Sequence, residues 1–299
     1  MIVALVLLSA FLHAGWNALL RVEPDKDRGL VGAISVAALF ACVIGGIRWA
    51  LGDQPFESLP SFGYTALAGV FEAVYFATLA LAMERGRLGP VYTVSRGGAV
   101  LVVWPLSIIL FDELVTATSS TGSAVVLGGL IIAGVAAQTR AGVAAQTRAG
   151  LGARSPAASG KGSSGIGWAS ACAVSIAGYH LSYKAALQTG GSASATFAVS
   201  LALAAVIRIV WFGRSGRAAL VTVFRTRAWR VILMGITCGG SFLILMEALA
   251  RGGSGFVLTL RNTSVLFAAL LAWAIGERPV RAEFVGAALV AIGAVIMSM

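Results

Sequence analysis

Charged residues are scarce in this sequence, and long uncharged stretches separate the few that occur. Only 11% of the 299 residues are charged, against about 25% in an ordinary soluble protein, and 58% are hydrophobic. Many windows of about 20 residues hold one charge or none, and that is the length a helix needs to cross a ~30 Å hydrocarbon core. A soluble fold needs polar helix faces, which these segments largely lack. The composition therefore predicts a membrane protein with several transmembrane helices.

Motifs for catalysis and metal binding are also missing. HExxH, GxSxG and aspartate-rich diphosphate motifs do not occur within the apolar segments. The cysteines, Cys42, Cys172 and Cys238, are odd in number and form no CxxC pair, so we interpret them as small buried residues. The two histidines are far apart in sequence, which disfavours a metal site. We expect no enzyme, no cofactor and no bound metal.

Ten apolar segments are separated by polar or turn-rich breaks such as VEPDKDRG and GDQPFESLP. The first lacks a basic stretch before it and its motif recurs later, so we interpret it as a retained helix and not as a signal peptide. The sequence thus predicts an all-α integral membrane protein with ten transmembrane helices. They are expected at residues 2–20, 30–51, 62–83, 89–110, 120–137, 166–187, 193–213, 229–250, 255–275 and 282–298.

The longest break, residues 139–165, is rich in Gly, Ser and Ala, which predicts a flexible linker between a first unit, residues 1–138, and a second, residues 166–299. It begins inside a duplication, because AGVAAQTR at 133–140 recurs at 141–148. We interpret this as a harmless duplication in a tolerant loop; the alternative is a longer amphipathic tail on the fifth helix.

The two units resemble one another in sequence. The first carries Ala-Gly-aromatic-polar followed by a basic residue, and so does the second; Arg followed by Glu 16 or 17 residues later also occurs in both, at an offset of 163 to 165 residues. The matching residues are Ala14-Gly15-Trp16-Asn17 with Arg21 and Ala177-Gly178-Tyr179-His180 with Lys184, then Arg96 with Glu113 and Arg261 with Glu277. Because five helices is an odd number, the second unit must enter the membrane inverted. Inverted repeats are common in secondary transporters and place the site near the midplane.

The basic residues are unevenly distributed among the loops. Sixteen of the 22 lie in the loops after the first, third, fifth, seventh and ninth expected helices. The positive-inside rule puts those loops in the cytoplasm and both termini outside. We interpret the net charge of +10 as a topology signal and as contacts with lipid head groups, and expect no nucleic-acid partner.

Three stretches carry a family resemblance. HAGWNALLR at 13–21, VYTVSRGGAVLVV at 91–103 and LTLRNTSVLFAALLAWAIGERP at 258–279 resemble the EamA-like members of the drug/metabolite transporter superfamily. The resemblance implies ten helices in two inverted repeats and a central cavity for a small metabolite, often an amino acid, with export more common than import, in a bacterial-type plasma (inner) membrane. Two features depart from the family. Its ten-helix members are usually drawn with both termini in the cytoplasm, against the charge bias, and Phe111-Asp112-Glu113 stands where Gly-Glu is common.

Ionisable groups inside the expected helices are the first candidates for a site, because each costs at least ~2.5–3.5 kcal/mol to insert. Arg96 and Arg261 lie about seven residues into the fourth and ninth helices, which enter from opposite faces. We expect both to reach the midplane and to bind an anionic group such as a carboxylate or phosphonate. The alternatives are a structural pair with Glu72, contacts with helix carbonyls, or snorkelling.

Glu72 lies in the middle of the third helix, where it is either a proton-coupling or substrate-binding group or half of a permanent ion pair. His13 is a second candidate for proton coupling, although a lone helical His is more often a packing group. Further candidates for substrate binding combine an aromatic or hydrogen-bonding side chain with a place in or beside the motifs, and the aromatic ones compete with an interface-belt interpretation. They are Trp16, Asn17, Tyr92, Tyr179, His180, Tyr183 and Asn262.

Together these features predict a secondary transporter of a small anionic or zwitterionic metabolite such as an amino acid. We expect an exporter that works by alternating access, with protons as the candidate coupling ion. The alternatives are an importer of an amino acid or organophosphonate, and a channel. The Glu that small multidrug pumps of the superfamily use in their first helix is absent here, which disfavours exchange of cationic drugs for protons. The sequence does not indicate an oligomeric state.

Overall fold

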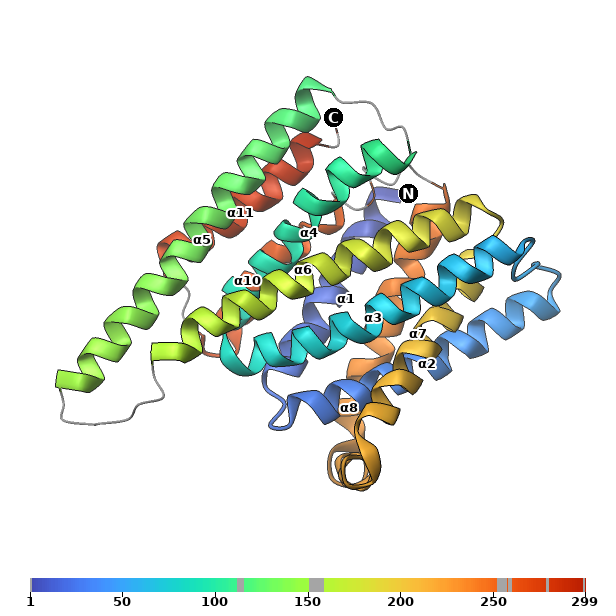
Figure 1. The fold of residues 1–299 in the computed structure, drawn as a ribbon, viewed down its shortest axis with the longest axis horizontal. Coiled ribbons are helices and arrows are strands. Elements are labelled where there is room, and N and C mark those ends of the chain that lie inside the picture. The colour runs from blue at the N-terminus through green and yellow to red at the C-terminus, as the bar shows by residue number, and fades with distance from the viewer. Residues whose placement is uncertain are drawn as a thin grey trace.

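The structure is a computed structural model that describes residues 2–111, 116–150, 159–251, 257, 260–277, 280–297 and 299. This part of the chain is a bundle of long helices with one isolated bridge, between Phe56 and Gly191 (Figure 1). The helices are α1 (Ile2–Arg21), α2 (Lys26–Ala50), α3 (Leu59–Arg85), α4 (Leu88–Phe111), α5 (Ala117–Gly150), α6 (Ser159–Gln188), α7 (Ala193–Trp211), α8 (Gly213–Arg251), α10 (Ser264–Ala274) and α11 (Arg281–Met297). Most of them begin and end within a few residues of the expected bounds.

Six of the described helices, α1 to α4, α7 and α8, are long and apolar enough to cross a membrane, and shorter apolar stretches occupy Ser120–Ala133 and Ser264–Ala274. Large apolar side chains also cover the outside of the bundle: Leu39, Ile109 and Trp273 are 68%, 73% and 68% exposed. Such a surface is stable in hydrocarbon and a liability in water. The chain is therefore an integral membrane protein, while the count of ten spanning helices stays a prediction.

Helix starts follow from short polar side chains at the breaks. Asp25 caps α2 by accepting a hydrogen bond from the Arg28 backbone N–H at 3.1 Å. Ser58 caps α3 by accepting from the Ser61 N–H at 3.2 Å. Ser192 caps α7 in the same way. These residues satisfy N–H groups that have no partner inside the helix, and they set where each span begins.

The expected linker is shorter than the sequence suggested. Helix α5 continues through the duplicated segment to Gly150, and α6 already begins at Ser159, so that only residues 151–158 of the expected linker lie outside the described residues. Alanine and glutamine have high helix propensity, which explains how the AGVAAQTR repeat extends α5. The alternative of a longer tail on the fifth helix is the one that the structure shows.

The basic segment after α7 is also helical, where a loop was expected. It forms the first part of α8, with Leu220 and Val223 buried, and the helix is broken at Arg227, whose φ of −139° and ψ of 29° are not helical. In Figure 1 a part of α8 is seen almost end-on at the lower edge, across the direction of the other helices.

Several contacts between helices have a counterpart elsewhere in the bundle, as the following pairs of contacts show. Helix α3 contacts α6 and α1 contacts α8; α4 contacts α6 and α1 contacts α10; α3 contacts α7 and α2 contacts α8. The pairs α2 with α7, α4 with α10 and α5 with α11 also pack together. Helices α5 and α11 lie side by side at one edge of the bundle (Figure 1).

Helices α5 and α11 touch through their backbones. A Cβ atom added at Gly286 would lie 2.7 Å from the Gly129 carbonyl oxygen, and one added at Gly293 would lie 2.6 Å from the Gly122 carbonyl oxygen. Small residues allow this approach, which is a common way for helices to associate in membranes.

Candidate functional site

Two arginines meet in the middle of the bundle, and neither pairs with a carboxylate of the described residues. Arg96 on α4 is 4% exposed and Arg261, just before α10, is 2% exposed, so neither snorkels to the surface. Among the described residues no ion pair involves either guanidinium, and the expected structural pair with Glu72 does not form. Arg261 Nε and Nη1 are buried without a hydrogen-bond partner. Two positive charges are thus held in a buried place without a counter-ion.

The imidazole of His13 on α1 lies between the two guanidiniums. Arg261 Nη2 lies 2.8 Å from His13 Nδ1, and Arg96 Nη2 contacts Nε2 on the other side of the ring. The Trp16 indole Nε1 donates to Nδ1 at 3.2 Å. The Ser241 hydroxyl on α8 accepts from Arg261 at 3.2 Å. His13 therefore joins groups from both units.

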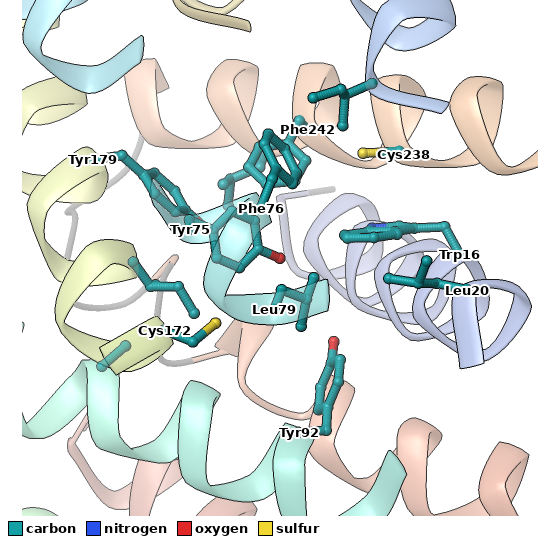
Figure 2. Close-up of a cluster of buried hydrophobic side chains, with 14 of the residues drawn as sticks. Trp16, Leu20, Tyr75, Phe76, Leu79, Tyr92, Cys172, Tyr179, Cys238 and Phe242 are labelled. Atoms are coloured by element: carbon teal, nitrogen blue, oxygen red, sulfur yellow. The ribbon is translucent and has the colours of Figure 1, made fainter. Parts of the chain in front are cut away.

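Aromatic rings enclose this charged group. Figure 2 shows Trp16, Tyr75, Tyr92, Tyr179 and Phe242 converging on one region. The Tyr75 hydroxyl accepts from Arg96 at 3.4 Å, and the Arg96 guanidinium carbon lies 5.9 Å and 5.8 Å from the centres of the Tyr75 and Tyr92 rings. Phe242 lies 4.4 Å from the Arg261 guanidinium carbon. Ring faces attract cations, so these walls stabilise the two charges without neutralising them.

Glu72 lies in a separate buried cluster beside the arginines. The Tyr183 hydroxyl on α6 donates to Glu72 Oε1 at 2.5 Å and lies 3.0 Å from the Ser200 hydroxyl on α7. Glu72 Oε2 is buried without a partner. The Tyr179 ring links this cluster to the aromatic residues around Arg96. Its centre lies 5.6 Å from that of the Tyr183 ring and 5.4 Å from that of the Tyr75 ring. An ionised Glu72 here would lack a cationic partner within the described residues.

The remaining predicted residues, Asn17, His180 and Asn262, are buried as well. Asn17 donates to the His13 carbonyl at 2.8 Å, and its Oδ1 has no partner. His180 stacks near Tyr179, with ring centres 4.5 Å apart, and its Nδ1 has no partner. Asn262 is 7% exposed, in the turn between Arg261 and α10.

Sequence reasoning missed Ser241, Phe242 and Ser200. Their only signal was their place in apolar helices: Ser241 follows Gly-Gly in GGSFLILME, a combination that permits close approach of a neighbouring helix. Outside this site, Glu247 pairs with Arg251 at 3.0 Å. Arg208 is 6% exposed and contacts Asp27.

Ion pairs join the helix ends on both sides of the buried site. At one end Arg21 Nε lies 2.5 Å from Glu277 Oε1, Leu88 N–H donates to Glu277 Oε2 at 2.9 Å, and Arg21 also donates to the Met83 carbonyl at 2.8 Å. At the opposite end Arg48 contacts Glu247. Two hollows lie elsewhere, one between the end of α1 and the part of α8 just after its break, and one on the outer side of α5 and α11. The two arginines themselves are covered from solvent.

Part of the chain is similar to a known protein family. Residues 163–299 match the EamA-like transporter family. The second unit belongs to that family. The EamA-like match confirms the family prediction and indicates a membrane transporter of the drug/metabolite type. It is a transporter family, which is consistent with the expectation that the chain is not an enzyme.

The fold of the whole chain, and not only its EamA-like unit, occurs in solved structures. Sixteen chains match it, and one crystal structure of a protein has a TM-score of 0.62 at 18% identity, covering 99% of this chain and 94% of that one. At that identity the likeness shows a shared fold alone. No curated protein matches the sequence.

Proposed function

We propose that this chain is a secondary transporter that moves a small metabolite carrying a carboxylate, anionic or zwitterionic, by alternating access. The observation that carries the proposal is the pair of buried guanidiniums, Arg96 and Arg261, which belong to different units and have no acidic partner within the described part of the chain. Burying a charge is costly unless it is paired, so such a pair is expected to serve a ligand that brings the missing negative charge. Arginine also binds carboxylates through two parallel hydrogen bonds.

The matched packing of the helices supports the proposal of ten spans in two inverted repeats. When α6 is taken as the counterpart of α1, α7 of α2, α8 of α3, α10 of α4 and α11 of α5, each main contact becomes another contact or itself. The pair α3 with α6 becomes α8 with α1, and α4 with α6 becomes α10 with α1. An axis through such an assembly puts Arg96 and Arg261 in equivalent places, as the sequence offset of 165 residues predicts.

Glu72 is proposed as the proton-coupling group. A buried carboxyl group without a cation is favoured in its protonated form, and it is ionised only when water or a cation reaches it. His13 is less suited to this task, because a proton there would add a third positive charge between the two arginines. Exchange of a substrate for protons in a bacterial inner membrane would serve export, and import of an amino acid or organophosphonate is the alternative direction.

Counterflow in proteoliposomes tests the function. Vesicles loaded with an unlabelled amino-acid or carboxylate mixture should take up the matching labelled compound against its gradient, which a channel cannot do. Arg96→Gln and Arg261→Gln should abolish this uptake. Arg251→Gln removes one charge from a side chain that is 57% exposed, and it should leave the uptake unchanged. Normal counterflow by both site variants would remove the basis of the proposal.

The coupling ion is tested in the same vesicles. Glu72→Gln keeps the volume and the acceptor oxygen for Tyr183 but cannot exchange a proton. We expect it to retain counterflow and to lose accumulation driven by a pH gradient. Accumulation equal to that of the unaltered protein would assign coupling to another group.

A further inference from the structure

The donors around His13 do not suit an imidazole. Arg96 faces Nε2, while Arg261 and the Trp16 indole face Nδ1, and all three carry N–H groups that only donate. A neutral imidazole accepts at one nitrogen and donates at the other. Whichever tautomer forms, one ring N–H faces an arginine donor, and the Ser241 hydroxyl, 3.4 Å from Nδ1, is the one acceptor near the ring nitrogens among the described residues. The position between the arginines is therefore built for a group with two acceptors.

A carboxylate is that group. Its two oxygens are separated by one carbon atom, as are the two nitrogens of the imidazole across Cε1, so a carboxylate lying in the plane of the ring would present an acceptor to each side. Both oxygens accept, and the negative charge balances the guanidiniums. Trp16 would keep an acceptor for its N–H group.

We propose that the His13 side chain occupies the position of the substrate carboxylate in the closed, empty transporter, and that the substrate displaces it. This inference rests on the proposed function and deepens it. It assigns one carboxylate, bridging Arg96 and Arg261, as the group that is recognised, and it makes His13 a residue that sets specificity by competing with the substrate.

Competition by His13 gives the empty carrier a way to stay closed. Without the ring, two cations would face each other across a buried space. With the ring in place, each guanidinium contacts a ring nitrogen, although one of these nitrogens carries a hydrogen and cannot accept. A ligand that makes both contacts well will replace the ring, and a cation or a neutral amine will not.

Three substitutions at position 13 test the inference in detergent-purified full-length protein, with acetate as the probe and tetramethylammonium as the cation control. His13→Ala removes the competitor, so the concentration of acetate that gives half the maximal thermal shift should fall at least ~10-fold. His13→Glu places a carboxylate of the protein itself at about the same distance from the main chain as the imidazole nitrogens. It should raise the unfolding temperature of the empty protein and abolish the response to acetate. His13→Gln has the shape of Glu without its charge and should do neither.

Two results would overturn the inference. One is weaker acetate binding by His13→Ala than by the unaltered protein, which would make His13 part of the binding surface; the other is an undiminished acetate response in His13→Glu. Should His13→Ala fail to fold, the comparison of His13→Glu with His13→Gln decides alone. Counterflow separates the two proposals. If Arg261→Gln loses counterflow while His13→Glu still responds to acetate, only this inference fails. If Arg96→Gln and Arg261→Gln both keep normal counterflow, the proposed function fails.

Discussion

Replacing Arg261 by Gln should make the protein more stable in the absence of substrate while weakening its binding of substrate. The two guanidiniums contact opposite sides of one imidazole, so their charges lie on the order of 6–8 Å apart. At an effective dielectric constant of about 20, two like charges at that distance repel by about 2 to 3 kcal/mol. Removal of one charge relieves this repulsion and also the cost of burying Arg261, of which Nε and Nη1 have no partner.

Some favourable contacts are lost in the same change. Arg261 donates to Ser241 and lies over Phe242, and these are worth about 1 kcal/mol each. The expected net effect is a stabilisation of about 1 kcal/mol. Substrate binding should weaken by about 10-fold to 100-fold, because a hydrogen bond to a charged group contributes about 1.5–3 kcal/mol and 1.4 kcal/mol is a factor of ten.

Thermal unfolding in detergent measures both effects, with tryptophan fluorescence as the signal, since the chain has seven tryptophans. The unfolding temperature of Arg261→Gln should rise in the absence of ligand and should no longer respond to the transported compound. Arg261→Lys keeps the charge and should show no such rise. A fall in the unfolding temperature of Arg261→Gln, restored by Lys, would refute the reasoning, because it would mean that the charge is compensated in the empty protein.

Three further substitutions probe the surroundings of the site. Tyr183→Phe leaves the Glu72 carboxyl group without its donor and should destabilise the protein by about 1–3 kcal/mol in a denaturant or thermal titration; an unchanged stability would show that the carboxyl group has another partner. Gly286→Leu places atoms where the backbone of α5 lies 2.7 Å away and should cost about 1–3 kcal/mol or more, whereas wild-type stability would deny the close contact. Arg21→Gln breaks the pair with Glu277 and should change the counterflow rate; the charge exchange Arg21→Glu with Glu277→Arg should restore it if the pair itself matters, and failure of the exchange would point to Arg21 alone.

The helices and the membrane setting were predictable from the sequence, because both depend on apolar length and on short polar breaks. Arg96 and Arg261 were predictable as candidate site residues because a charge inside an apolar run is rare and because their offset repeats between units. Their meeting at His13 was not. A histidine in a helix gives no sign of its partners, and the distance between α1, α4 and Arg261 is set by packing of the whole bundle.

Two local features also escaped prediction for physical reasons. The repeat AGVAAQTR contains small residues that occur in loops as well as in helices, so composition alone could not show that α5 continues to Gly150. The basic stretch before Arg227 reads as a cytoplasmic loop by charge, yet Leu220 and Val223 give it an apolar side that packs against the bundle. Charge identifies a side of the membrane and does not distinguish a loop from a helix lying along that side.

The contact between α5 and α11 bears on how the two units can move. The backbones touch at Gly129 with Gly286 and again at Gly122 with Gly293, seven residues or about 10 Å further along each helix. Two points of contact without intervening side chains fix both the spacing and the crossing angle of this pair. If one unit rotates against the other, the contact between α5 and α11 is the pivot. Displacements then grow with distance from this edge, so that α2 and α7, which pack together elsewhere in the bundle, move furthest.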